Sequence, residues 1–322
     1  MVDVVGLGHP VMDQLVNISR FPGGNSGTRA EEIFHQGGGN VATAMAAAAR
    51  LGAKAGMIAK IGGDAIGDFI IKDFKYNGVD TSRILRDGPQ SHSAFVIAVS
   101  EIEYGTRAFI GRGGARASPL LPEEIDYDYI ASAKILHLEN GGPASTAAAR
   151  FARDRGIKVC IDAGYYSEDR VEIIPHIDIF IASEMFYNVM FKGREADIQK
   201  NCEEIHNAGP SVVWVTYGAK GCVGLVDGRF YEVPTFDVPV KDTTGAGDVF
   251  HGAYIAAMLE GLPHPECARY ANAVSSIKCM FVGGRTGIPT RETLGRFLED
   301  GTILTEEIEG RLDYYRRSFL EN

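Results

Sequence analysis

The segment from Lys241 to Tyr254 combines the residue types that phosphoryl transfer requires. It reads KDTTGAGDVFHGAY, a polar, glycine-rich turn that leads directly into an apolar helix. Glycines 245 and 247 let the backbone approach a ligand closely. The amides of Gly245, Ala246 and Gly247 fall in the first helical turn, where N–H groups lack intrahelical partners and favour a bound anion.

Asp248 lies in the same turn, directly after these amides. In most helices an aspartate at this position only complements the helix dipole. Here the amides would stabilise charge growing on a γ-phosphate, while the carboxylate would accept the proton of the attacking hydroxyl. The segment therefore predicts Asp248 as a general base and the amides of Gly245, Ala246 and Gly247 as an anion hole.

Charge and motif content exclude several other classes of protein. The net charge is −10, which argues against nucleic acid and anionic membranes as partners, because both are bound through Lys and Arg. No G-x-x-x-x-G-K-[ST] sequence occurs, so the chain is not a P-loop kinase, and no H-E-x-x-H or Cys/His spacing predicts a metal site. The stretch from Gly6 to Pro10 lacks the third glycine of a dinucleotide fingerprint.

The five cysteines and the N-terminal sequence predict a cytoplasmic protein. No C-x-x-C pair occurs, so we expect buried, reduced thiols. Residues 1–10 contain no basic or long apolar stretch of a signal peptide, and no window of about 18 apolar residues predicts a membrane span.

Apolar runs of strand length alternate with helical stretches, which predicts a parallel sheet with helices on both faces. The clearest strands are Val2–Leu7, Ala55–Ile61, Ala94–Val99, Lys134–Leu138, Ile157–Ile161, Ile177–Ile181, Val212–Thr216 and Cys222–Val226. Helical stretches are Asn40–Leu51, Gly67–Tyr76, Ala144–Arg155, Ile198–Asn207, Ala246–Leu259 and Pro265–Met280. The sequence after Thr302 has helical spacing and is expected to pack on the outside. Trp214 is expected in the core.

Segments of about 14–36 and 91–117 interrupt this alternation with β-like pieces. They predict a small β lid over the carboxyl ends of the parallel strands, where sheets of this kind bind ligands. No linker separates independent domains, so we expect one domain over residues 1–322. Unpaired lid edges would favour a homodimer.

An ordered set of motifs resembles the ribokinase-like (PfkB) carbohydrate kinase family. Besides residues 241–254, the set comprises Gly6-x-Gly8 followed by Asp13, Gly37–Asn40, Ile61–Asp68, Val215–Gly221, and Gly283-x-x-x-Gly287-x-Pro289. The resemblance covers residues 2–290 and implies a three-layer α/β/α sandwich with a mostly parallel sheet and a β lid. It also implies ATP and Mg²⁺ as cofactors, with K⁺ as a further ion in several relatives.

The resemblance assigns site residues by position. Asp13, Gly38, Gly39 and Asn40 would hold the sugar, and Thr216, Gly218, Gly221 and Asn272 would line the nucleotide site. Asp242 and Thr244, with the loop from Val282 to Gly287, would form a monovalent-cation site. Asp13 could instead cap a turn, and Asn40 could cap the helix that follows it. Arg112 is a candidate for binding the carboxylate of an acidic sugar, the alternative being a solvated strand face.

One position departs from the family pattern. Relatives carry Asn-x-x-Glu after the strand matching Ile177–Ile181, where it is linked to magnesium. Here Ser183 and Tyr187 stand at those places, and Glu184 is the nearest carboxylate. Glu184 is therefore the candidate magnesium residue, in a different register.

The expected function is ATP-dependent phosphorylation of a hydroxyl on a small unphosphorylated sugar: a ketohexose, a pentose or a keto-deoxy sugar acid. A nucleoside kinase is the first alternative, because Phe95, Tyr104 and Phe109 could form a slot for a base. A sugar-binding sensor that has lost catalysis is the second, supported by the altered magnesium motif.

Overall fold

A nine-stranded sheet runs through the centre of the protein, seen in a computed structural model that describes residues 1–322 except 89, 102, 105, 113–116 and 318–322. In spatial order its strands are β13 (Arg229–Val233), β12 (Cys222–Val226), β11 (Val212–Thr216), β10 (Ile179–Ser183), β9 (Lys158–Ala163), β8 (Ile135–Leu138), β1 (Val4–Leu7), β4 (Ala55–Ile61) and β5 (Asp80–Arg86). Strand β12 pairs antiparallel with both β11 and β13 at one edge, and all the other neighbours pair parallel.

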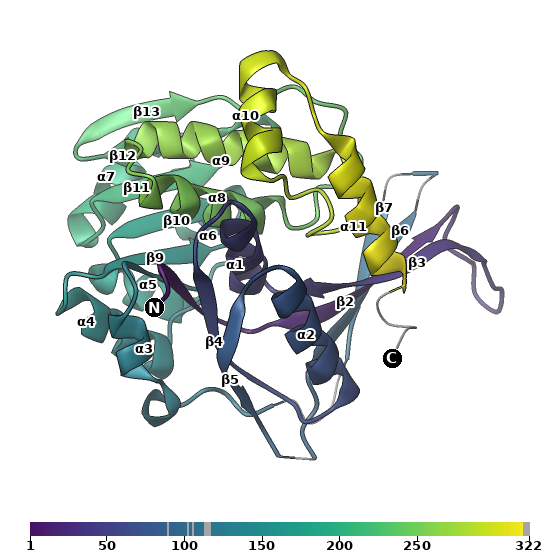
Figure 1. The fold of residues 1–322 in the computed structure, drawn as a ribbon. Coiled ribbons are helices and arrows are strands. Elements are labelled where there is room, and N and C mark those ends of the chain that lie inside the picture. The colour runs from purple at the N-terminus through teal and green to yellow at the C-terminus, as the bar shows by residue number, and fades with distance from the viewer. Residues whose placement is uncertain (89, 102, 105, 113–116, 318–322) are drawn as a thin grey trace.

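Helices cover both faces of this sheet (Figure 1). One apolar cluster joins a face of the sheet to α1 (Asn40–Arg50), α2 (Ala65–Tyr76), α8 (Ala246–Leu259), α9 (His264–Cys279) and α10 (Arg291–Asp300). A second cluster joins the other face to α3 (Tyr127–Ala131), α4 (Pro143–Arg153), α6 (Glu184–Met190) and α7 (Ile198–Ala208), with the short α5 (Glu168–Glu172) nearby in sequence. Three-residue 3₁₀ turns lie at Pro122–Glu124, Ile174–His176 and Gly218–Lys220. The predicted three-layer α/β/α sandwich is confirmed.

The core contains the residues that the sequence placed there. Trp214 is fully buried, and its indole N–H donates to the Tyr254 hydroxyl at 3.0 Å. All five cysteines are buried and free. Within the described residues, no helix combines the length and the apolar character that crossing a membrane would need.

A second, four-stranded sheet stands apart from the first (Figure 1). Its order is β3 (Ala30–Gly38), β2 (Val11–Ile18), β6 (Ala94–Glu101) and β7 (Thr106–Gly111), with β2 and β6 parallel and the other pairs antiparallel. Strands β6 and β7 lie within the predicted segment 91–117, whereas β2 and β3 extend beyond the predicted segment 14–36 at both ends. Of the segment 91–117, residues 102, 105 and 113–116 lie outside the described residues.

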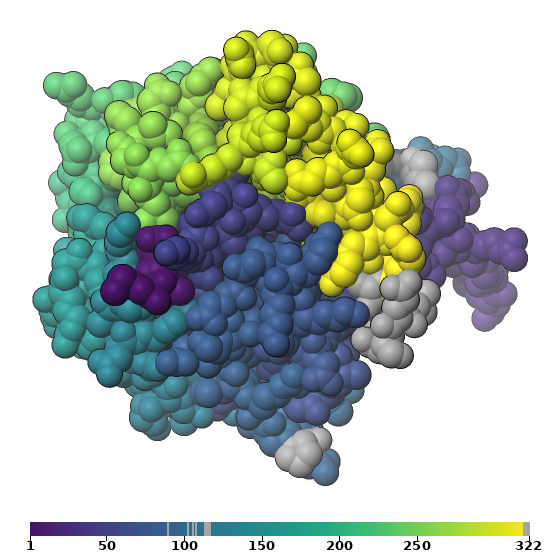
Figure 2. All heavy atoms as spheres, viewed as in Figure 1, coloured from purple at the N-terminus to yellow at the C-terminus, as the bar shows by residue number. Residues whose placement is uncertain are grey.

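The helix α11 (Thr305–Arg317) packs against this second sheet. Tyr315 is fully buried with Leu15, Phe34 and Ala98, one from each of three strands. Figure 2 shows the C-terminal segment, in yellow, lying against the blue part of the chain. The expectation of a helix after Thr302 that packs on the outside agrees with α11, whose inward face brings the buried Tyr315 into a small core with the second sheet.

Candidate active site

Polar side chains gather where the central strands end. Glu139 directly follows β8, and its carboxylate accepts the His9 amide at 2.6 Å from the loop after β1. Asp162, near the end of β9, is buried and accepts the Asn40 side-chain amide at 3.2 Å. The carboxyl ends of parallel strands are where open sheets bind ligands. Neither Glu139 nor Asp162 was predicted from the sequence as a site residue.

Helix α8 points its first turn at this cluster. Gly245 is the N-cap residue with φ of +73°, a conformation that glycine adopts without strain. The Ala246 amide donates to the Thr243 carbonyl at 3.2 Å, so the turn already uses one of the predicted anion-hole groups. Around Gly247 a side-chain carbon would meet no atom within 4 Å. The open approach to α8 is therefore at Gly247, beside Asp248.

The carboxylates of this cluster shift one another's pKa. Burial is the main cause for Asp248, whose pKa is raised, and the neighbouring Asp162 raises it further. Burial likewise raises the pKa of Asp162. The pKa values of Asp13 and Glu139 rise to about 7, again mainly through burial. Four acids with raised pKa values at one place are typical of a functional site.

The glycines after β3 make room for the site. A side-chain carbon at Gly38 would overlap the Asp13 carboxylate, and one at Gly39 would overlap the His9 carbonyl. Gly39, with φ of +92°, is the N-cap residue of α1 and offers no side chain. Asn40 is the first helical residue and its amide reaches Asp162, so the alternative that Asn40 caps α1 is wrong.

Arg285 lies fully buried beneath these glycines. Its guanidinium pairs with the equally buried Asp73 of α2 and donates to the Gly38 carbonyl at 3.3 Å. A side-chain carbon at Gly37 would overlap this pair. The positive charge lowers the pKa values of Asp13 and Asp248, although burial outweighs it for both. Arg285 therefore supports the backbone under the site.

A cavity of about 460 Å³ lies beyond the first turn of α8, between the end of β11 and helix α9. The four residues assigned to the nucleotide all line it: Thr216, Gly218, Gly221 and Asn272. Ala246 and Gly247 line it too, so the cavity reaches the proposed anion hole. The Asn272 side-chain amide donates to the carbonyls of Val233 and Pro234 at 3.1 Å each, which holds the cavity wall. Its volume is within the range of small-molecule sites.

The residues assigned to a monovalent cation are already occupied by protein groups. The Asp242 carboxylate accepts the amides of Thr244 and Gly283, each at 2.8 Å. The Asp242 carbonyl accepts the buried Lys278 ammonium, also at 2.8 Å. Burial favours a raised pKa for Asp242, but Lys278 and these amides outweigh it and hold the pKa below its ordinary value. The Lys278 ammonium therefore already places a positive charge where the resemblance implied a monovalent cation.

The positions of the altered magnesium motif have structural roles. The Ser183 hydroxyl accepts the Phe186 amide at 3.0 Å and caps α6. Tyr187 is buried, and its hydroxyl donates to the Glu195 carbonyl at 2.8 Å. Glu184 is exposed in the first turn of α6, directly after β10. Carboxylate oxygens are ligands that Mg²⁺ prefers, so Glu184 and the buried acids fit such an ion.

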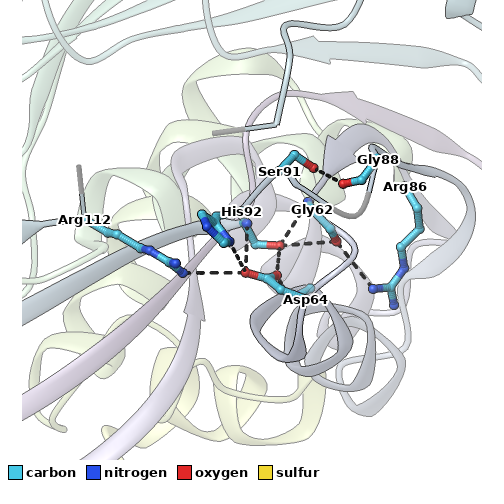
Figure 3. A network of polar contacts seen from close by, with 9 residues as sticks. Gly62, Asp64, Arg86, Gly88, Ser91, His92 and Arg112 are labelled. Carbon is cyan, nitrogen blue, oxygen red and sulfur yellow. Dashed lines mark hydrogen bonds and ion pairs between the residues drawn. The ribbon is translucent and has the colours of Figure 1, made fainter. Parts of the chain in front are cut away.

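Arg112 lies in the polar network drawn in Figure 3. Its guanidinium is 3.6 Å from the carboxylate of Asp64, which caps α2 and also accepts the Ser93 hydroxyl at 2.7 Å. His92 is 3.7 Å from the same carboxylate. The network ties the start of β6 and the end of β7 to α2. Arg112 is thus paired with protein here, unlike the solvated strand face considered as its alternative.

The residues that the sequence analysis missed carried weak signals. Glu139 could have been found as a polar residue directly after a buried strand. Asp162 and Lys278 gave no such signal, because each stands in apolar sequence and has its partners far away in the chain. Arg285 stands inside the glycine motif 283–289, but nothing in that motif indicates a role for its side chain.

Comparisons with known proteins agree with this geometry. A family model described as pfkB family carbohydrate kinase matches residues 1–291. A ribokinase of Haemophilus influenzae is 29% identical over 266 residues, which span 81% of this chain and 87% of that protein. A nucleoside kinase of Methanothermobacter thermautotrophicus is 28% identical over 303 residues, spanning 92% and 95%. The structure of Arabidopsis thaliana ribokinase complexed with ribose and ATP matches with a TM-score of 0.82 at 25% identity, covering 92% of this chain and 99% of that one.

Proposed function

Because the chain belongs to the pfkB family of carbohydrate kinases, and is therefore an ATP-dependent kinase, we propose that it phosphorylates a hydroxyl of a small unphosphorylated sugar. One observation carries this proposal. The first turn of α8 lies between the cavity lined by Thr216 and Asn272 and the acids of the central strands. A nucleotide in the cavity and a sugar beside the acids would then meet at Asp248.

In this mechanism, Asp248 takes the proton of the sugar hydroxyl as that oxygen attacks the γ-phosphorus. A new P–O bond forms to the sugar, the bond between the γ-phosphorus and the β–γ bridging oxygen breaks, and ADP leaves with its electrons. The open amide of Gly247 would stabilise charge on the transferring group. Glu184 and Asp162 would hold the Mg²⁺ ion of Mg-ATP, which would supply neutralisation of the phosphate charge.

The sugar would lie against Asp13, Glu139 and Asn40. Carboxylate and amide groups suit the hydroxyls of a sugar, because they accept or donate hydrogen bonds without needing a charged partner. Asp13 belongs to β2, so the second sheet would act as a lid that excludes water during transfer. Gly38 and Gly39 would let the backbone approach the sugar closely.

To bind the carboxylate of a sugar acid, the Arg112 guanidinium would have to break its ion pair with Asp64 or contact both carboxylates at once. The geometry therefore favours neutral sugars over acidic ones.

The exposed apolar side chains of Ile33 and Ile110 support the further proposal that the second sheet pairs with the second sheet of another copy of the chain in a homodimer.

A nucleoside is the second candidate substrate. Phe95 of β6 pairs in register with Met12, so it lies beside Asp13, and Phe109 of β7 is exposed. Two aromatic rings on the lid could stack on a base.

The test is ADP release from Mg-ATP with a panel of pentoses, ketohexoses, keto-deoxy sugar acids and nucleosides. We expect a signal that depends on a neutral sugar and is lost in Asp248→Asn. ADP release with nucleosides alone would show that the substrate is a nucleoside and not a sugar. If the protein binds ATP but releases no ADP with any compound of the panel, the result would favour the sugar-binding sensor. It would contradict a kinase that acts on these compounds.

Activity is expected to be independent of K⁺. The Lys278 ammonium already places a positive charge at Asp242, so an added ion has no role there. The measurement compares turnover in potassium and tetramethylammonium chloride at equal ionic strength. Lys278→Ala should make turnover depend on K⁺, whereas Lys241→Ala, an exposed lysine nearby, should not. Wild-type turnover that falls when K⁺ is removed would contradict the assignment.

A further inference from the structure

Two histidines and a cysteine meet in the layer between the central sheet and α8. His137 of β8 and Cys160 of β9 are paired neighbours on adjacent strands, and both are fully buried. His251, in the turn of α8 that follows Asp248, is also buried. One donor atom from each residue lies within 4.8 Å of the other two. The kinase mechanism uses none of these three side chains.

The hydrogen bonds of the histidines determine which ring nitrogens remain available. His137 Nδ1 is 3.3 Å from the Cys160 carbonyl, which can only accept, so Nδ1 carries the proton. His251 Nε2 is 3.5 Å from an Asp162 carboxylate oxygen, so its proton belongs on Nε2. The other nitrogens, His137 Nε2 and His251 Nδ1, are buried and have no hydrogen-bond partner. Each therefore presents a bare lone pair in the interior.

Buried polar atoms without partners are costly, and native proteins rarely leave them so. Moving a proton to satisfy one nitrogen would remove the hydrogen bond to Cys160 or the contact with Asp162. Burial also lowers the pKa of both histidines, which keeps the rings neutral. Neutral imidazoles with free lone pairs are the form that binds a metal ion.

We propose that His137, Cys160 and His251 bind a Zn²⁺ ion, or a first-row transition ion of similar preference, through three protein donors. Donors on one Zn²⁺ ion lie about 3.3–3.8 Å apart for bonds of about 2.0–2.3 Å. The donors, now within 4.8 Å of one another, would move closer, and the two imidazoles, now stacked with ring centroids 5.2 Å apart, would turn toward the ion. Nitrogen and sulfur donors are those that zinc prefers among common cellular ions.

The surroundings of the cluster match those of metal-bound histidines. Such histidines generally donate their second N–H to a backbone carbonyl or a carboxylate. His137 faces the Cys160 carbonyl in this way, and His251 Nε2 lies 3.5 Å from the Asp162 carboxylate. The charges also balance: a divalent ion offsets one thiolate from Cys160 and the carboxylate of Asp162. Burial raises the pKa of the Cys160 thiol in the absence of an ion, and coordination would displace that proton.

The ion would fasten β8 and β9 to α8 beneath the proposed base. Asp162 would then connect the centre to Asn40 through its two oxygens. This role is independent of the sugar that the enzyme uses.

The test measures metal content by elemental mass spectrometry on full-length protein from zinc-supplemented cultures, after desalting with a weak chelator. We expect about one ion per chain in the wild type and less than about a tenth in Cys160→Ala. Cys202→Ala, an equally buried thiol in α7, should keep the ion. Protein from cobalt-supplemented cultures should show a sulfur-to-cobalt charge-transfer band that Cys160→Ala lacks.

His137→Gln provides a second variant if Cys160→Ala does not fold, and it too should lose the ion. A wild type that contains no transition metal and gives no cobalt band would overturn the proposal. Metal retained at full content in both variants would overturn it as well, because the ion would then lie elsewhere. Neither measurement depends on kinase activity, so failure here leaves the proposed function untouched.

Discussion

Asn in place of Asp248 is expected to lower kcat by about 10²- to 10⁴-fold, the range typical of losing a general base. The amide cannot take the hydroxyl proton, while its shape leaves the first turn of α8 intact. The measurement is steady-state ADP release with saturating Mg-ATP and sugar, together with the affinity for ATP by calorimetry. We expect the ATP affinity to stay unchanged, because the cavity is lined by other residues.

Two pH measurements separate a catalytic role of Asp248 from a structural one. Since burial and Asp162 raise its pKa, the acidic limb of kcat/KM should lie above that of an ordinary aspartate. The folded pKa exceeds the unfolded one, so the ionised form costs stability at pH 8 and the cost disappears near pH 4. Asp248→Asn should therefore raise the melting temperature at pH 8 but not at pH 4. Near-wild-type turnover in this variant would refute the base assignment.

Replacing Arg285 by Met is expected to lower the free energy of unfolding by about 3–5 kcal/mol, as when one partner of a buried ion pair is removed. Asp73 would remain as a buried, uncompensated charge, and one of its oxygens already has no hydrogen-bond partner. The backbone at Gly38 would also lose a donor. Denaturant unfolding monitored by circular dichroism measures the change.

The double variant Arg285→Met/Asp73→Leu should recover much of that loss, because no charge is then left buried. Arg83 provides the matched control. It pairs with Asp126 in a part-exposed setting, so Arg83→Met should cost about 0–1 kcal/mol. An Arg285→Met variant as stable as this control would show that the buried pair contributes little.

Local sequence was sufficient for much of the fold. The predicted bounds of β4, β11, β12 and α8 match the structure, because short apolar runs bounded by turn residues define each element. The nucleotide residues were predicted by resemblance, and the structure brings all four to one cavity. Strand β13 was missed, since Arg229–Val233 mixes charged and aromatic residues at the edge of the sheet.

The contacts of the site between residues far apart in the chain could not be predicted from the sequence. Nothing in the local sequence of Arg285 indicates Asp73 as its partner, because the two lie 212 positions apart. The cluster of His137, Cys160 and His251 shows no motif spacing, because β8, β9 and α8 each supply one residue. Asn40 precedes an alanine-rich run and has the composition of a cap, yet Gly39 takes that place.

The contacts of α11 bear on how the protein matures during synthesis. Arg316 pairs with Glu32 across 284 positions, and Tyr315 covers Leu15 and Phe34. A nascent chain on the ribosome therefore exposes the apolar face of β2 and β3 until almost all of these residues have emerged. Exposed strands of this kind invite aggregation, and chaperones bind them. We expect a chain truncated before Tyr315 to give a lower yield of soluble protein than the full chain, although the truncation removes no residue of the proposed active site.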